Sequence, residues 1–163
     1  IDLSNNTVLE YLYLNNNTKF TENINISSLT NLIEYENYCS NQSAIDISNA
    51  PLLIALDAGL NSFTSIDLSN NPFMKDLRLD SNSLSSLDLS LNPNIDYVSV
   101  SNNSFSSTVV DAILADLVSF PEDPFNKDAY LNGTNAAPST SGTTNATTLS
   151  SRNWLIFINS GNN

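Results

Sequence analysis

The amino-acid sequence predicts a solenoid, a mainly β fold in which short coils of chain stack along one axis. Three consecutive segments align without a gap, namely 45–65, 66–86 and 87–107, and each is 21 residues long. Within each segment, apolar and polar residues alternate over two short stretches, which is the pattern of half-buried strands. A fixed period of this length is typical of repeat proteins whose units bury a core only by stacking on one another.

Each unit contains the motif Leu-x-x-Leu-x-Leu-x-x-Asn twice, offset by about half a period. We therefore expect two short parallel strands in each coil and two parallel sheets, one on each side of the solenoid. Inward side chains should form one narrow core between them, because successive residues of a strand point to opposite faces. The residues expected to face inward are Ile45, Ile47, Ile66, Leu68, Leu87 and Leu89 on one side, and Leu56, Ala58, Leu77, Leu79, Val98 and Val100 on the other.

Asparagine recurs at two positions of the repeat. Asn61, Asn82 and Asn103 occupy one of them, and Asn71 and Asn92 the other. A side-chain amide can pair with backbone N–H and C=O groups that a sharp turn leaves without partners. The spacing therefore predicts ladders of asparagines, one residue per coil, along the turns.

Residues 74–92 match, nearly position for position, the nested pattern of the bacterial 21-residue class of leucine-rich repeat proteins. The chain resembles this family over about residues 1–107, which makes about five coils, with an irregular stretch at 29–44 where Leu29 replaces the expected Asn. The resemblance implies a binding or scaffold role. Members of this class are typically surface or secreted bacterial proteins, and some occur in phages.

The repeat stops after Phe105, and 108–163 is expected to form a C-terminal αβ cap on the solenoid. Helical spacing begins at Ser107 and ends before Pro121, and a strand at 129–131, a short helix at 143–152 and a strand at 154–158 follow. A cap is expected because the last coil would otherwise expose an apolar end. Ile1 begins within a predicted strand, so we also expect the chain to be part of a longer chain or a larger assembly.

Composition excludes several classes of function. The net charge is −12 with only five Lys and Arg residues, which disfavours nucleic acid and anionic membranes as partners. No apolar run is long enough for membrane insertion, and one cysteine cannot form an internal disulfide. Histidine is absent, so an enzyme would have to rely on carboxylates alone, and the enzymatic alternative would be a hydrolase that uses only carboxylates. We therefore expect no enzymatic activity.

The outward positions of one predicted sheet vary from coil to coil, although a regular ladder does not demand variation there. Solenoids bind through such surfaces, and Tyr and Arg are frequent anchors in interfaces. The alternative is an ordinary solvated face with scattered aromatic residues. The candidate binding residues are Tyr11, Tyr13, Glu34, Glu36, Asp57, Asp76, Arg78 and Tyr97.

Outward carboxylates recur on the other predicted sheet, at Asp46, Asp67 and Asp88, each followed two residues later by Ser. Adjacent coils should lie about 4.8 Å apart, so these side chains form a row that could bind calcium. Calcium requires roughly six to eight converging oxygen ligands, so we favour local pairing of Asp with Ser and solvent. No other cofactor is expected.

These observations favour a non-catalytic, acidic recognition or adhesion module that is secreted or lies on a cell surface. Its partner would be a protein or a glycan, bound through the variable β-face. The alternative is a structural component of a virion, fibre or surface layer whose partners are other subunits of the assembly. Its location would then include the virion surface.

Overall fold

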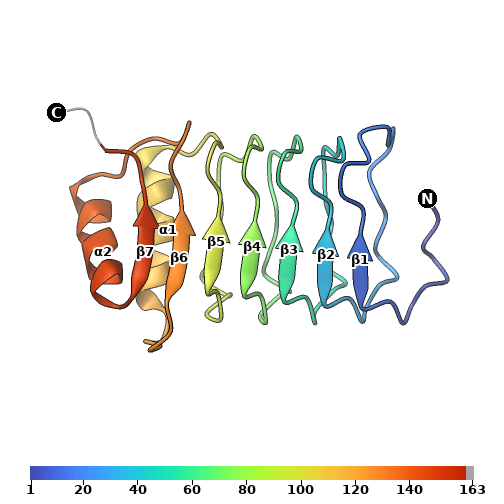
Figure 1. Ribbon diagram of the computed structural model, residues 1–163, viewed down its shortest axis with the longest axis horizontal. Coiled ribbons are helices and arrows are strands. Elements are labelled where there is room, and N and C mark those ends of the chain that lie inside the picture. The colour runs from blue at the N-terminus through green and yellow to red at the C-terminus, as the bar shows by residue number, and fades with distance from the viewer. Residues whose placement is uncertain (161–163) are drawn as a thin grey trace.

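A computed structural model of the chain describes residues 1–160, which form an elongated stack of coils (Figure 1). One strand of each coil joins a single sheet along one long side of the molecule. The strands are β1 (Tyr11–Tyr13), β2 (Glu34–Glu36), β3 (Ala55–Asp57), β4 (Asp76–Arg78), β5 (Tyr97–Ser99), β6 (Lys127–Tyr130) and β7 (Trp154–Phe157). All neighbouring pairs are parallel, and the order in the sheet follows the order in the sequence.

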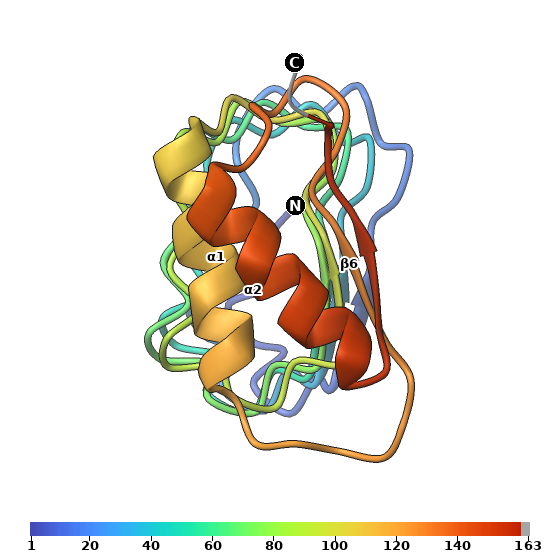
Figure 2. The same ribbon diagram turned by 90° about the vertical axis from the view of Figure 1, so that its left-hand side faces the viewer.

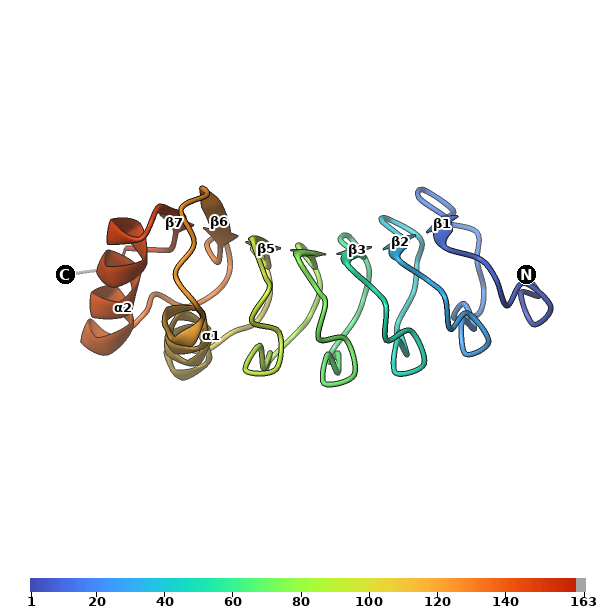
Figure 3. The ribbon, with the colours of Figure 1, turned by 90° about the horizontal axis from the view of Figure 1, so that it is seen from below.

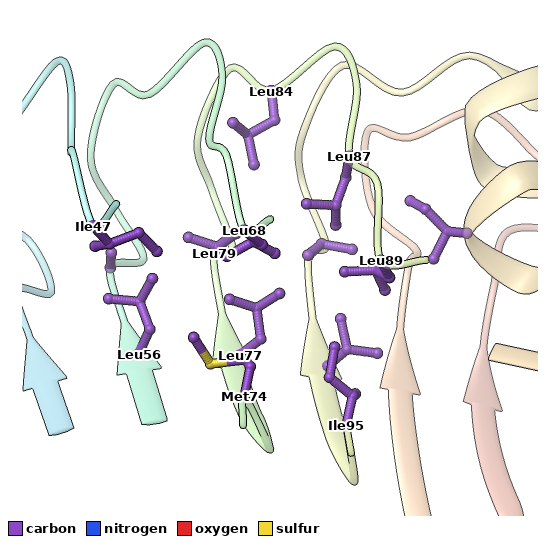
Figure 4. Packing of buried hydrophobic residues seen from close by; sticks show 14 of the residues in the cluster. Ile47, Leu56, Leu68, Met74, Leu77, Leu79, Leu84, Leu87, Leu89 and Ile95 are labelled. Atoms are coloured by element: carbon purple, nitrogen blue, oxygen red, sulfur yellow. The ribbon is translucent and has the colours of Figure 1, made fainter. Parts of the chain in front are cut away.

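The core runs as a narrow column behind the sheet (Figure 4). Leu77 and Leu79 of one coil and Leu89 of the next are fully buried, as the alternation of apolar and polar residues predicts. Of the inward set, only Ile45 and Ile66 remain partly accessible. Phe63, Leu84 and Phe105 are buried as well. The burial of this set indicates that the core depends on contacts between coils, because one coil encloses no interior of its own.

The coils differ from the prediction in one respect, because the described residues contain one strand per coil and no second sheet. The segments around Ile47, Leu68 and Leu89 bury their inward residues without forming a ladder. Their backbone groups bond locally instead: the Ala50 N–H donates to the Ile47 carbonyl at 3.0 Å, and the Leu53 N–H to the Ala50 carbonyl at 3.1 Å. Two successive tight turns therefore replace the second strand.

A ladder of asparagines runs along the turn that follows the strands. The Asn82 Nδ2 donates to the carbonyl oxygens of Ala58 at 3.0 Å and Leu79 at 3.1 Å, and its Oδ1 accepts from the Phe63 N–H at 3.0 Å. Asn61 and Asn103 make equivalent bonds. In the coil of the irregular stretch, the buried Ser40 takes this place and donates to the Leu14 carbonyl at 2.7 Å. Each amide therefore ties its own turn to the preceding coil.

The residue before each ladder position has a left-handed backbone, whatever its type. These residues are Asn16 (φ 63°), Cys39 (φ 52°), Leu60 (φ 50°), Ser81 (φ 56°) and Asn102 (φ 55°). The left-handed region costs an L-residue about 1–2 kcal/mol, and Asn adopts it more readily than Leu does. The repeat therefore imposes a strained conformation on Leu60 and Cys39.

Replacing Leu60 by Asn should stabilise the protein by about 0.5–1 kcal/mol, because Leu60 is 46% exposed and its side chain contributes little to the core. The measurement is urea unfolding followed by circular dichroism. Leu52→Asn is the control, since Leu52 has similar exposure (43%) and a negative φ. Equal effects of the two substitutions would show that the gain does not come from the backbone.

The C-terminal segment continues the same sheet with helices in place of turns. Helix α1 (Ser107–Ser119) precedes β6, and α2 (Thr140–Ser151) precedes β7. Helix α1 lies on the side away from the strands, beside the turns of the earlier coils (Figure 3), and α2 crosses the end of the stack between α1 and β7 (Figure 2). Val110, Ile113, Leu114 and Leu117 of α1 extend the core. That this segment acts as a cap remains a prediction.

The helices are held to their neighbours by carboxylates. The Asp116 carboxylate of α1 accepts from the Leu89 N–H at 3.1 Å, and burial raises the pKa of Asp116. The Asp111 carboxylate of α1 accepts from the N–H of Ser139 at 2.9 Å and from its hydroxyl. Ser139 is the N-cap of α2, and this helix begins three residues before the expected position 143 because of that cap. Within residues 1–160, neither helix has the length and apolarity needed to cross a bilayer.

Candidate interaction face

The sheet face gathers the candidate binding residues on one surface. The middle residue of each strand points into the core, so the residues on either side of it face outward. Register places Tyr11 opposite Glu34 and Tyr13 opposite Glu36. The face is defined here by the outward residues of β1 to β7: Tyr11, Tyr13, Glu34, Glu36, Ala55, Asp57, Asp76, Arg78, Tyr97, Ser99, Asp128, Tyr130, Leu155 and Phe157.

A hollow of about 210 Å³ lies on the part of this face that β2, β3 and β4 form. The residues that line it lie on these three strands, and four of them carry carboxylates. The lining residues are Glu34, Glu36, Ala55, Leu56, Asp57, Asp76 and Arg78. Five of the eight residues singled out from the sequence therefore share one site, and its surface is predominantly anionic.

Arg78 is held in a fixed position at the edge of the hollow. Its Nε lies 2.8 Å from Asp76 Oδ1 and its Nη2 lies 2.9 Å from Asp76 Oδ2, so the two side chains form a bidentate pair along β4. Its guanidinium also lies 4.5 Å from the centre of the Tyr97 ring. The hydrogen bond to Asp76 raises the pKa of Arg78, so the guanidinium remains charged throughout the accessible pH range. Both contacts preorganise this side chain for binding.

The acidic side chains differ in how they are satisfied. Asp57 is half-buried, and burial raises the pKa of its carboxyl, while the Gly59 N–H at 3.2 Å acts in the opposite direction. Glu36 accepts from the Asn15 side chain. Partial loss of solvent, together with the charge of Glu34, raises the pKa of the Tyr13 hydroxyl.

An aromatic ridge, formed by Tyr97, Tyr130 and Phe157, continues the face toward its C-terminal end. The centres of the Tyr97 and Tyr130 rings lie 5.6 Å apart, and Tyr130 and Phe157 stack at 4.5 Å with an angle of 6° between the rings. Tyr97 was among the residues predicted from the sequence, whereas Tyr130 and Phe157 were not. The signal was present in the two predicted C-terminal strands, but the 21-residue period does not reach them.

Ser99 differs from the other outward residues because it is buried. Its hydroxyl donates to Asp80 Oδ1 at 2.6 Å, and the same oxygen accepts from the Ser101 N–H at 2.9 Å. Ser99 is in register with the outward Arg78, but it contributes to the turn after β4 and is closed off from solvent. Asp80, which was not singled out from the sequence, orders the turn after β4 beside the ridge.

The aspartate row, formed by Asp46, Asp67 and Asp88, lies on the side of the coils away from the sheet. Asp46, Asp67 and Asp88 each accept from the backbone N–H of the Ser two residues later, at 3.0, 2.9 and 2.9 Å. Asn25 does the same with Ser27. Within residues 1–160, no three His, Cys, Asp or Glu side chains converge closely enough to hold a metal ion. The geometry gives these aspartates a local role in turns and offers no support for a calcium site.

The row predicts a loss of stability in acid. Hydrogen bonds from Ser48, Ser69 and Ser90 lower the pKa of Asp46, Asp67 and Asp88 below the unfolded value of about 3.9. A carboxyl whose pKa is lowered in the folded state stabilises the protein above the unfolded pKa, and this contribution is lost as pH falls through the folded pKa. The free energy of unfolding, measured in urea at steps below pH 5, should therefore fall less steeply in Asp46→Asn/Asp67→Asn/Asp88→Asn than in the unchanged chain. Parallel slopes would contradict this role.

Comparison with known proteins supports the fold. No protein-family model matches the chain, and no curated protein sequence matches it. Among solved structures, the functional domain of InlJ from Listeria monocytogenes, described as including a cysteine ladder, is 31% identical with a TM-score of 0.62, over 64% of this chain and 23% of that one. The single cysteine of the present chain cannot form such a ladder.

Two further structures from Listeria monocytogenes cover almost the whole chain. Internalin C2 is 18% identical with a TM-score of 0.72, over 96% of this chain and 64% of that one. The internalin InlF is 18% identical with a TM-score of 0.66, over 97% of this chain and 50% of that one. The present chain thus spans less than two thirds of each of the three structures. Together with the parallel sheet, these similarities show that the chain has a leucine-rich repeat fold.

Proposed function

We propose that the chain is a non-catalytic recognition or adhesion module, secreted or on a cell surface, that binds a protein or a glycan through the sheet face. The observation that carries this proposal is the preorganised group at the centre of the face, where Asp76 and Tyr97 fix Arg78 beside the acidic hollow. A regular ladder needs no such arrangement. Anchors of this kind lose little side-chain freedom on binding.

The structural neighbours favour the same role. They are internalins, and the sequence resembles a class of leucine-rich repeat proteins typically found on bacterial surfaces or secreted. None of the three neighbours is described as a component of a virion, fibre or surface layer, so they give no support to the structural alternative. The absence of histidine and the local pairing of the aspartate row also favour binding over catalysis.

The test is binding to an array of purified extracellular protein domains and glycans. The variant Tyr13→Ala/Arg78→Ala/Tyr97→Ala should lose binding to whatever the unchanged chain binds, while its thermal transition by circular dichroism stays within a few degrees. A matched control is Phe73→Ala/Leu91→Ala/Lys19→Ala, which removes two apolar side chains and one cation from exposed positions off the sheet face. Binding that survives in the first variant and disappears in the control would refute the assignment of the face.

A further inference from the structure

The carboxylates of the sheet face outnumber the cations available to them. On strands β2 to β4, Glu34, Glu36, Asp57 and Asp76 face outward, and Arg78 is the single Lys or Arg among the outward residues of these strands. Arg78 is already paired with Asp76. Within residues 1–160, no ion pair includes Glu34, Glu36 or Asp57.

These unpaired charges converge on the hollow. Asp57 is half-buried, and burial raises the pKa of its carboxyl, although the Gly59 N–H and the charge of Arg78 act in the opposite direction and compensate the ionised form in part. The hollow of about 210 Å³ opens to solvent between β2 and β4. A cationic group entering it would meet several carboxylates at once and offset the cost of keeping them charged side by side.

The aromatic ridge decides what kind of molecule accompanies that cation. Tyr97 lies between Arg78 of β4 and Tyr130 of β6, and Tyr130 lies between Tyr97 and Phe157 of β7. Arg78 therefore covers part of the Tyr97 ring and Phe157 stacks on the Tyr130 ring, while Tyr97 and Tyr130 meet at a tilt of 41°, so each tyrosine ring already has a partner within the protein itself. A sugar ring that stacks on aromatic residues requires an open face. The ridge instead offers ring edges, hydroxyl groups and the exposed side chains of Phe157 and Leu155, which suit apolar and aromatic side chains of a protein.

We infer that the occupant of the sheet face is a protein segment that carries Lys or Arg, with its cation in the hollow lined by Glu34, Glu36 and Asp57 and an apolar side chain against the aromatic ridge. This inference rests on the proposed function and narrows its partner to one class. The cation provides attraction and orientation, since charges at an interface act mainly on the rate of association and on specificity. The ridge provides the buried apolar contact that holds the complex together.

A random peptide library displayed on phage, selected against the immobilised chain, tests the inference directly. The enriched peptides should contain Lys or Arg near an aromatic or large aliphatic residue. Their synthetic forms should bind more weakly as salt is raised. The variant Glu34→Gln/Glu36→Gln/Asp57→Asn should weaken binding about tenfold or more, because three charges facing the cation are lost.

The matched control is Asp46→Asn/Asp67→Asn/Asp88→Asn, which removes the same number of charges from the opposite side of the coils. Asparagine can still accept the hydrogen bond from the Ser N–H two residues later, as Asn25 does from Ser27. This control should change affinity by about twofold or less, because distant charges are screened. A second variant, Tyr130→Ala, should weaken binding without reducing its salt dependence. If the two triple variants behave alike, if the selected peptides lack cations, or if no peptide is enriched, the inference is wrong.

A glycan array run in parallel separates this inference from the proposed function. Binding to glycans alone, lost in Tyr13→Ala/Arg78→Ala/Tyr97→Ala, would overturn the protein partner and leave the sheet face as the recognition surface. Loss of any role for the sheet face in all of these assays would overturn both.

Discussion

Replacing Asn103 by Ala should lower the free energy of unfolding by about 3 kcal/mol, a large change for a single residue with little apolar surface. The Asn103 Nδ2 donates to the carbonyl oxygens of Leu79 and Val100, each at 3.0 Å, and the Oδ1 accepts from the Leu84 N–H at 3.0 Å. All three bonds are buried. Alanine would leave these backbone groups without partners in a site that is 2% exposed, and each such group costs about 1–3 kcal/mol when no water reaches it.

Urea unfolding followed by tryptophan fluorescence and circular dichroism measures the effect. Asn94→Ala is the matched control, because the Asn94 amide donates to the Pro72 carbonyl at 2.8 Å but is exposed, so water can replace it. Its loss should be about 0.5 kcal/mol or less. Asn103→Asp should destabilise almost as much as alanine does, since a carboxylate accepts from Leu84 but faces two carbonyl oxygens. Similar losses for Asn94 and Asn103 would contradict a structural role for the ladder.

The ladder also shows how far the sequence predicts the fold. Asn61, Asn82 and Asn103 were recognisable because they recur at the period of the strands. Asn135 makes the same bonds one coil later, donating to the carbonyls of Val100 and Leu131 at 2.9 and 3.0 Å. It was not predicted, because α1 lengthens that coil and no fixed spacing leads to it.

The second strand of each coil was predicted wrongly for a physical reason. Alternation of apolar and polar residues reports which side chains face inward, and those residues are indeed buried or partly buried. It does not report where the backbone groups find their partners. In the segments after Asp46, Asp67 and Asp88, local turns satisfy the backbone, and no ladder forms between the coils there.

The sheet face was predictable only where the period holds. Outward residues of β1 to β5 followed from counting, so the hollow could be anticipated as a list of residues but not as a cavity. Tyr130 and Phe157 escaped because their contact with Tyr97 depends on the register of β5, β6 and β7. Register across coils of unequal length is set by packing of the helices, which a single sequence does not reveal.

Removing both partners of Lys127 should destabilise the protein by about 3 kcal/mol or more, and more than removing Lys127 itself. The side chain of Lys127 is 5% exposed. Its Nζ lies 3.1 Å from Asp96 and 3.7 Å from Asp123, and 5.7 Å from the centre of the Trp154 ring. This group joins β6 to the loop after α1 and to β7. Asp96→Ala/Asp123→Ala would leave a buried ammonium without a carboxylate, and such a charge costs several kcal/mol because water cannot solvate it.

Lys127→Met removes the buried ammonium and leaves the two carboxylates. It keeps the length and apolar stem of the side chain against Trp154 and leaves Asp96 and Asp123, which are 45% and 35% exposed and can turn to solvent. The expected loss is therefore smaller, about 1–2 kcal/mol. Urea unfolding of both variants, with the exposed Lys75→Met as the control for loss of one lysine, measures the difference. If Lys127→Met destabilises as much as the double variant, the stability comes from packing of the lysine stem, and the enclosed charge is not the dominant constraint on this end of the sheet.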